Sequence, residues 1–184
     1  MKLCFIGSGI EIEKTNVENI EIYAVARAVC SFFDTLIYGG SKIGLMQSFA
    51  QAFRSYGGKV ISVVPDWLEQ EGLIDEDSEV IRCLNLAERK QLMFSDSDAI
   101  LCYPGGLGTL DELFEVLAHH AVDKTKTCPP IYLYNWEKYF SPLLLQLETA
   151  DELGLIHSGN YSSLQAFETV EKLLVLLQQH SVSQ

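Results

Sequence analysis

A glycine-rich segment in the middle of the chain has residue types suited to holding a phosphate. It reads PGGLGTLDE, from Pro104 to Glu112, and directly follows the apolar run AILCY. Glycines let backbone amides approach an anion, a threonine hydroxyl adds a donor, and the amino end of the next helix favours negative charge. The spacing differs from GxGxxG, and it differs from the P-loop because Gly108 is followed by Thr109 and Leu110. The segment therefore indicates a phosphate cradle of another kind.

The same segment also allows a purely structural interpretation. Thr109 and Glu112 have the TxxE spacing of a capping box, in which Thr109 is the N-cap and Glu112 reaches back to its amide. A cap leaves three glycines unexplained, and these are Gly105, Gly106 and Gly108. We therefore favour a functional loop, followed by a helix that begins near Leu110.

Two further patterns are weak when each is taken alone. The run ERK at residues 88–90 is a charge cluster early in a predicted helix, and most such clusters are solvated helix faces. The run YGGSKIGLM at residues 38–46 places Gly39 and Gly40 between a strand and a helix, as an ordinary turn does. Each pattern gains meaning only beside the glycine-rich segment.

The elements that position these residues follow from an alternation of apolar runs and helical stretches. Runs with the length and composition of buried strands are residues 3–6, 35–38, 59–64, 99–103 and 131–134, with a sixth near 164–167. Apolar residues recur at helical spacing in residues 17–33, 43–56, 84–95, 110–122, 142–152 and 170–179. The alternation predicts a doubly wound α/β fold, in which helices cover both faces of a parallel sheet.

Glycines follow the first, second and fourth predicted strands. This places three glycine turns at one edge of the sheet, because parallel strands end at the same edge. Ligands bind outside the carboxyl ends of the strands in open parallel sheets, where helix amino ends point at them. We expect the functional site at this edge.

The longest irregular stretch is acidic. Residues 66–82 include six acidic side chains between Glu69 and Glu79 and no basic one before Arg82. We predict a solvated surface loop there, with a lid over the site as the alternative.

Length and charge limit the classes of partner. The 184 residues suit a single domain, residues 1–184. The net charge is −12, from 13 Lys+Arg and 25 Asp+Glu, which repels nucleic-acid polymers and anionic membranes. A single nucleotide stays compatible with this charge, because amides and one or two cations can bind a phosphate locally. No apolar run approaches the ~20 residues of a membrane span, so we expect a cytoplasmic protein.

Metal and disulfide chemistry are not indicated. The five cysteines are widely spaced and form no CxxC pair. His119 and His120 end a predicted helix, where histidine suits the negative end of the helix dipole. We expect neither a metal nor a cofactor.

Taken together, the three patterns resemble the Lonely Guy (LOG) family of cytokinin riboside 5′-monophosphate phosphoribohydrolases, whose members are often labelled lysine decarboxylases. PGGLGTLDE matches the family signature PGGxGTxxE at every fixed position, and ERK lies at the expected distance upstream. GGSKIGLM resembles the family turn GG-x-x-x-GLM. A weaker pattern runs from PPIYLYN through Tyr139 and Leu143 to GLI at residues 154–156. The resemblance covers about residues 35 to 177.

The resemblance implies a Rossmann-like homodimer that hydrolyses the N-glycosidic bond of a purine nucleoside 5′-monophosphate, such as AMP or a cytokinin ribotide. The products are the free base and ribose 5-phosphate. Carried over by position, Arg89 and Glu112 are the catalytic pair. Glu112 would stabilise positive charge on the ribose or position water, and Arg89 would hold an anion or the leaving base. The residues expected to bind phosphate and ribose are Ser8, Gly39, Gly40, Lys90, Gly105, Gly106, Leu107, Gly108 and Thr109.

Two other functions stay open. The chain departs from the family pattern at Ser41, Gln47 and Ala87, which leaves a non-catalytic nucleotide or molybdenum-cofactor carrier as an alternative. A pyridoxal-phosphate-dependent lysine decarboxylase is the least favoured, because the signature contains no lysine for a Schiff base.

Overall fold

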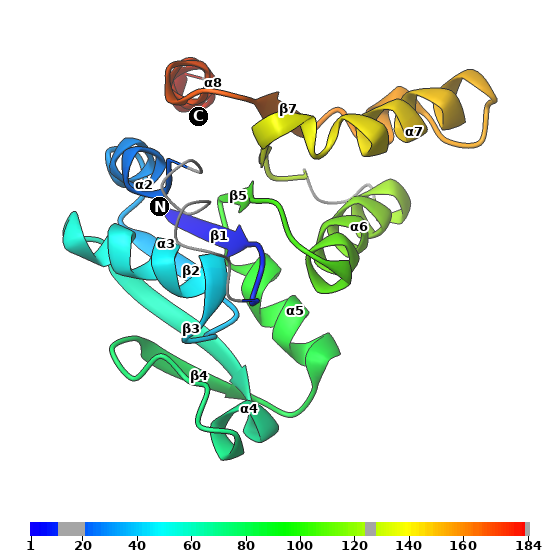
Figure 1. Ribbon diagram of the computed structural model, residues 1–184. Coiled ribbons are helices and arrows are strands. Elements are labelled where there is room, and N and C mark those ends of the chain that lie inside the picture. Colours follow the sequence, from blue (N-terminus) through cyan, green and yellow to red (C-terminus); the bar gives the residue numbers. More distant parts are fainter. Residues whose placement is uncertain (11–20, 124–127, 183–184) are drawn as a thin grey trace.

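Buried apolar runs form a parallel sheet in the computed structural model, which describes residues 1–10, 21–123 and 128–182 (Figure 1). The strands are β1 (Lys2–Ile6), β2 (Thr35–Tyr38), β3 (Lys59–Pro65), β4 (Glu79–Cys83), β5 (Ala99–Cys102), β6 (Ile131–Tyr134) and β7 (Leu164–Phe167). Their order in the sheet is β4-β3-β2-β1-β5-β6-β7, and every neighbouring pair is parallel.

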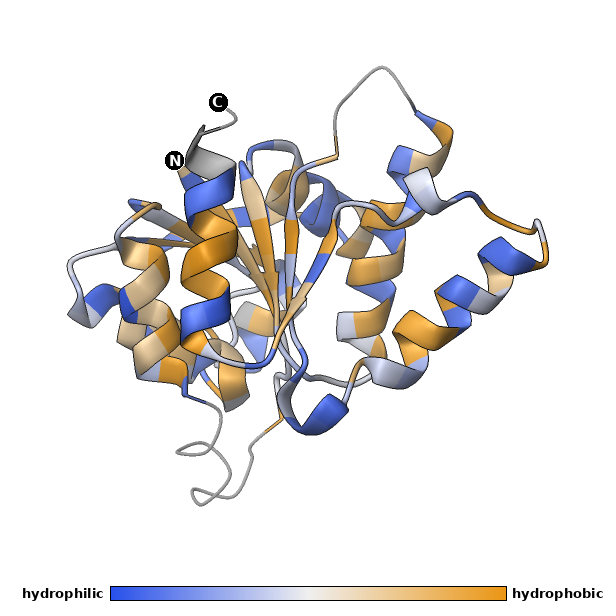
Figure 2. Cartoon of the chain, turned by 90° about the horizontal axis from the view of Figure 1, so that it is seen from above, coloured by the Kyte–Doolittle hydropathy of each residue, from blue (hydrophilic) through white to orange (hydrophobic). Residues whose placement is uncertain are grey.

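Helices cover both faces of this sheet. They are α2 (Ile22–Cys30), α3 (Gly44–Ser55), α4 (Asp66–Gln70), α5 (Leu86–Ser95), α6 (Leu107–Val122), α7 (Ser141–Glu152) and α8 (Val170–Val182), with short 3-10 turns η1 (Trp136–Lys138) and η2 (Ser158–Asn160). Alternate residues of β1 explain the two layers: Leu3 and Phe5 pack toward α2, α3 and α8, and Cys4 and Ile6 pack toward α5 and α6. Figure 2 shows the apolar strands between the two groups of helices. The predicted doubly wound α/β fold is confirmed.

One predicted loop is wrong in part. The stretch 66–82 contains the short helix α4 and the edge strand β4, besides irregular turns. Strand β4 has no continuous apolar run, because most of its side chains are exposed at the edge of the sheet. The continuous apolar pattern of a strand that is buried on both faces is therefore missing from its sequence.

Helix boundaries differ from the predicted ones mainly at amino ends. The predicted helix 17–33 corresponds to α2, and residues 17–20 of the prediction lie outside the described residues. Helix α6 begins at Leu107, three residues before the predicted start, because Gly106 in extended conformation serves as its N-cap. The other predicted helices agree with the observed ones within about three residues.

The two central strands mark the point where the chain changes direction across the sheet. From β1 the chain adds β2, β3 and β4 on one side, and it then returns to add β5, β6 and β7 on the other. Ile6 of β1 is in register with Cys102 of β5, and the Tyr103 amide donates to the Ile6 carbonyl at 2.9 Å. The turns that leave β1 and β5 therefore lie side by side, at the kind of switch point where doubly wound proteins bind ligands.

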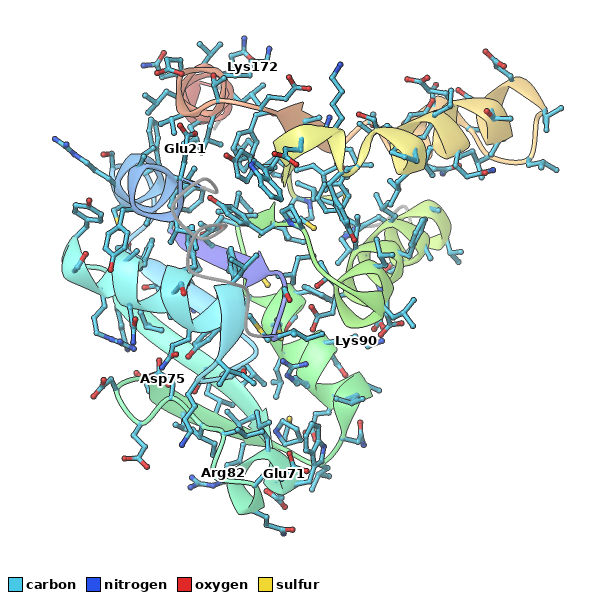
Figure 3. The ribbon with its side chains drawn as sticks, in the orientation of Figure 1. Glu21, Glu71, Asp75, Arg82, Lys90 and Lys172 are labelled. Atoms are coloured by element: carbon cyan, nitrogen blue, oxygen red, sulfur yellow. The ribbon has the colours of Figure 1, made fainter. Side chains whose placement is uncertain are left out.

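Part of the acidic stretch crosses back over the turn after β2. Residues 73–75, which we call the strap, pair with residues 40–42 through an antiparallel bridge between Ser41 and Ile74. The Asp75 amide donates to the Gly40 carbonyl at 3.0 Å. The buried Asp75 carboxylate accepts from the Tyr38 hydroxyl and from Arg54, both at 2.7 Å (Figure 3 labels Asp75). The strap is thus a fixed structure rather than a freely solvated loop.

Within the described ranges, no helix combines the length and apolar character needed to cross a membrane.

Candidate active site

Arg89 of α5 and Glu112 of α6 form a nearly buried ion pair. Nη1 of Arg89 lies 3.2 Å from Oε1 of Glu112, and the two side chains are 14% and 10% exposed. They approach each other where strands β2 and β3 end, so the sequence-predicted catalytic pair is brought together at the carboxyl edge of the sheet. A nearly buried ion pair at this edge is a candidate catalytic centre.

Backbone carbonyls fix the plane of the Arg89 guanidinium. Its Nε donates to the Val63 carbonyl at 3.1 Å, and its Nη2 donates to the Gly39 carbonyl at 3.0 Å. A guanidinium has five N–H donors, and these two bonds together with the Glu112 bond use three. Two donors are left outside these bonds for a ligand. Arg89 is therefore oriented before any ligand binds.

Gly39 has to be glycine because Arg89 lies against it. A Cβ atom on Gly39 would stand 1.6 Å from Nη2 of Arg89, which is far inside any allowed contact. Gly40, the next residue, adopts a left-handed φ of +77°, and a Cβ there would meet Val64 at 2.6 Å. The glycine pair after β2 thus makes room for the arginine and turns the chain away from β3.

Burial governs the electrostatics of Glu112. Loss of solvent raises the pKa of the Glu112 carboxyl, and the positive charge of Arg89 offsets only part of this effect. The buried thiols of Cys4 and Cys102 share this environment: burial and then the charge of Glu112 raise their pKa values well above normal. The carboxylate therefore lies above a neutral, apolar part of the sheet.

The glycines of the signature have two different roles. A Cβ on Gly105 would lie 2.1 Å from Oγ1 of Thr109 and 2.9 Å from the Ser8 amide nitrogen, so Gly105 is required by close packing. A Cβ on Gly106 or Gly108 would meet no described atom within 4 Å. Packing against the described residues does not require glycine at these two positions. They border open space, where a ligand could approach the backbone.

The capping box considered from the sequence is absent, and that interpretation is wrong. Gly106 is the N-cap of α6 and no side chain caps it, while Thr109 lies inside the first turn. Glu112 bonds to Arg89 instead of reaching back to Thr109. The amides of the first turn are consequently free of a side-chain cap and available to an anion.

Ser8 lies where the turns after β1 and β5 meet. Its side chain is largely buried and accepts a hydrogen bond from the Ile10 amide at 3.2 Å. Its carbonyl accepts from the Met46 amide at 3.2 Å, and its own amide faces Gly105. The structure therefore gathers Ser8, Gly105 and the buried Thr109 beside each other.

Lys90 is placed between helices rather than at the glycine turns. Its ammonium group bonds to Asp111 at 2.9 Å and also to Glu115, both on α6 (Figure 3 labels Lys90). These two carboxylates raise the pKa of Lys90. A lysine that forms a Schiff base needs a lowered pKa, so the setting of Lys90 does not suit that chemistry.

Sequence reasoning missed the contacts made through the backbone. The Val63 and Gly39 carbonyls that hold Arg89 have no signature in the residue types. The hydroxyl of Tyr139 donates to the Gly105 carbonyl, and only the weak C-terminal pattern drew attention to this tyrosine. Among the described residues, no group of three or more His, Cys, Asp or Glu side chains is arranged to hold a metal ion.

Comparison with known proteins identifies the family. A family model described as "Possible lysine decarboxylase" matches residues 46–177. A probable cytokinin riboside 5′-monophosphate phosphoribohydrolase of Arabidopsis thaliana is 35% identical over 149 residues, which cover 79% of this chain and 72% of the relative. The chain belongs to the LOG family.

Other LOG-family relatives agree with this assignment. A probable cytokinin riboside 5′-monophosphate phosphoribohydrolase of Oryza sativa is 35% identical over 79% of this chain, and the match spans 59% of that relative's length. A cytokinin riboside 5′-monophosphate phosphoribohydrolase of Mycobacterium tuberculosis is 41% identical over 103 residues, which cover 55% of each chain.

Solved structures share the fold of this LOG-family chain at low sequence identity. A molybdenum cofactor binding protein of Rippkaea orientalis has a TM-score of 0.69 at 18% identity, covering 100% of this chain and 97% of the other. A Moco carrier protein of Chlamydomonas reinhardtii has a TM-score of 0.70 at 14% identity, covering 100% and 98%. These likenesses show the Rossmann-like fold alone.

The two classes of glycine predict different effects of an added methyl group. Gly39→Ala should lower the free energy of unfolding by about 2 kcal/mol, because the new Cβ has to displace Arg89. Gly106→Ala should cost at most about 1 kcal/mol, because its Cβ meets open space and only the preference of an N-cap for glycine over alanine is lost. Urea unfolding of both variants measures the difference. Equal losses of stability would show that Arg89 is not packed on Gly39.

Proposed function

We propose that this chain hydrolyses the N-glycosidic bond of a purine nucleoside 5′-monophosphate, such as AMP or a cytokinin ribotide, to the free base and ribose 5-phosphate. The observation that carries the proposal is the nearly buried Arg89–Glu112 pair beside uncapped amides at the carboxyl edge of the sheet. The names of the relatives support the same reaction class.

Different groups of the site bind the phosphate, the ribose and the base. Amides of the first turn of α6 and the open backbone at Gly106 and Gly108 bind the phosphate. As the bond from ribose C1′ to the base nitrogen breaks, positive charge grows on the ribose, and ionised Glu112 stabilises it and positions the water. The water oxygen bonds to C1′, one water proton goes to the base nitrogen, and the other stays on the new C1′ hydroxyl of ribose 5-phosphate. Arg89 holds Glu112 in place and has two donors left for the base.

A substrate panel tests the reaction. The protein is incubated with AMP, with a cytokinin ribotide and with adenosine, and free base and ribose 5-phosphate are assayed. We expect release from one or both nucleotides and far less from adenosine, which lacks the phosphate. Saturable nucleotide binding without release of any base would instead favour the carrier alternative and refute the hydrolase.

Replacing the carboxylate by an amide separates chemistry from folding. Glu112→Gln should lower kcat/KM at least about a hundredfold, because charge stabilisation at the ribose is lost. The amide oxygen can still accept from Arg89 but no longer balances its charge, so the melting temperature should fall, and circular dichroism at the assay temperature verifies that the variant is folded.

Asp111→Asn provides the matched control for this change. Asp111 is the neighbouring carboxylate on α6, and its side chain is 65% exposed and paired with Lys90. This variant should keep kcat/KM within about threefold of the unmodified protein, because exposed ion pairs contribute little. Equal losses in the two variants would count against a special role of Glu112.

The buried carboxylate also sets the pH dependence. Burial raises the pKa of Glu112 above its ordinary value of 4.5, so the group takes up its proton at a higher pH than an exposed glutamate does. Ionised Glu112 is the active form, and activity should therefore fall as pH drops through this raised pKa. The pH profile of kcat/KM measures it. An acid limb centred at or below pH 4.5 would contradict this role.

We also propose that two copies of the chain pair through α7. None of its residues is buried, and Figures 1 and 2 show α7 at the side of the molecule away from α2 and α3. Leu145 and, just past the end of α7, Leu153 are 62% and 70% exposed. Exposed leucines on such a helix are typical of a surface that is covered in an oligomer.

Charged substitutions on this face test the dimer. The native chain should have twice its chain mass of 20.6 kDa in light scattering after size exclusion. The variant Leu145→Glu/Leu153→Glu should shift it to the monomer. Val175→Glu, a matched change at a half-exposed position of α8, should leave the mass unchanged. A native monomer would refute the pairing.

A further inference from the structure

Tyr139 connects the segment before α7 to the glycine-rich signature. Its hydroxyl donates a hydrogen bond to the Gly105 carbonyl oxygen, across a separation of 34 residues in sequence. Its ring packs edge-on against the buried Phe140 ring, with centroids 4.8 Å apart and an interplanar angle of 83°. The side chain is 44% exposed, so it lies at the surface beside the signature.

The backbone before Tyr139 is bent into an unusual conformation. Glu137 and Lys138 both have left-handed φ values, of 47° and 61°, which residues other than glycine rarely adopt. Such conformations persist only where the surrounding structure enforces them, and they concentrate at functional sites. The bend places Tyr139 beside Gly105 of the glycine-rich signature.

Hydrogen bonds from the Asn135 side chain stabilise this bend. This buried side chain accepts from the Phe140 amide at 2.8 Å and donates to the Ser141 hydroxyl at 3.1 Å. Its amide group also donates to Glu168 at 3.4 Å. The connection between β6 and α7 is therefore fixed at its start and at its end.

The bond from Tyr139 sets the direction of the next amide. The Gly105 carbonyl and the Gly106 N–H belong to one planar trans peptide unit, so they point in opposite directions. Holding the carbonyl oxygen on Tyr139 therefore fixes the direction of the N–H, which points the opposite way within the same plane. Gly105 itself has little freedom, because it packs against Thr109 and the Ser8 amide, while Gly106 borders open space.

We propose that Tyr139 is a positioning residue that orients the Gly106 amide toward the phosphate of the ligand. Tyr139 acts through the peptide plane and does not itself touch the reacting atoms. This inference rests on the proposed function, because it names the residue that prepares the phosphate site. The tyrosine hydroxyl therefore contributes to the affinity for the phosphate and does not contribute to the rate of bond cleavage.

Removing one oxygen atom tests the inference. Tyr139→Phe keeps the ring packing on Phe140 and loses only the bond to Gly105. We expect the Kd for ribose 5-phosphate, measured by calorimetry, and the KM for AMP each to rise about fivefold, in line with the net worth of one hydrogen bond. The kcat should change less than twofold, and the KM for adenosine should not change.

Tyr161→Phe is the matched control. The hydroxyl of Tyr161 donates to Asp151 at 3.3 Å, near the carboxyl end of α7. This variant should bind ribose 5-phosphate as the native protein does. Melting temperatures of both variants within about 2 °C of the native value verify that the fold is kept.

The outcomes separate this inference from the proposed reaction. Weaker ribose 5-phosphate binding in Tyr139→Phe, without base release by the native protein, supports the positioning role and refutes the hydrolase. Equal affinity of the native protein and Tyr139→Phe overturns the positioning role, whether or not the native protein hydrolyses AMP. A fall in kcat with unchanged affinity overturns it as well.

Discussion

A guanidinium group that is nearly closed off from water needs its charge balanced where it lies. Arg89 meets this need with one carboxylate, Glu112, and with two backbone carbonyls from the ends of neighbouring strands. Much of the surrounding structure follows from this arrangement. The residue after β2 has to be glycine, α6 has to start early enough to bring Glu112 down to α5, and the carboxylate becomes hard to ionise. The ion pair thus links the ends of two strands and two helices at the place where chemistry is expected.

Most of the fold could be predicted from the sequence, and the exceptions have a common cause. Buried strands such as β1 and β5 are continuous apolar runs because helices cover both of their faces. Strand β4 is an exception because it lies at the exposed edge of the sheet. Most of its side chains are in contact with solvent, so its composition resembles that of a loop. The sequence predicts too late a start for α6, because a glycine N-cap has no side-chain signature and Thr109 suggests a cap that does not form.

The site shows the same division between side chains and backbone. The motif predicted that Arg89 and Glu112 belong together, and the structure places them in contact. It did not indicate that the neighbouring Lys90 joins α5 to α6 through two carboxylates, because spacing along a helix does not fix which face a residue takes. Every residue has a backbone carbonyl group, so the residue types do not indicate which carbonyls accept a hydrogen bond. The bonds from Arg89 to the Gly39 and Val63 carbonyls could therefore be found only in the structure.

The strap has a consequence for how this protein can be altered. The Gly39–Gly40 turn is bonded to Arg89 through the Gly39 carbonyl and to Asp75 through the Gly40 carbonyl. Surface segments at the edge of a sheet are usually good places for a tag, an insertion or a domain fusion. Here, a change in length next to the strap would displace the peptide units that hold Arg89 in place. An engineer should therefore treat the acidic segment around Asp75 as part of the candidate site, although it lies far from Glu112 in the sequence.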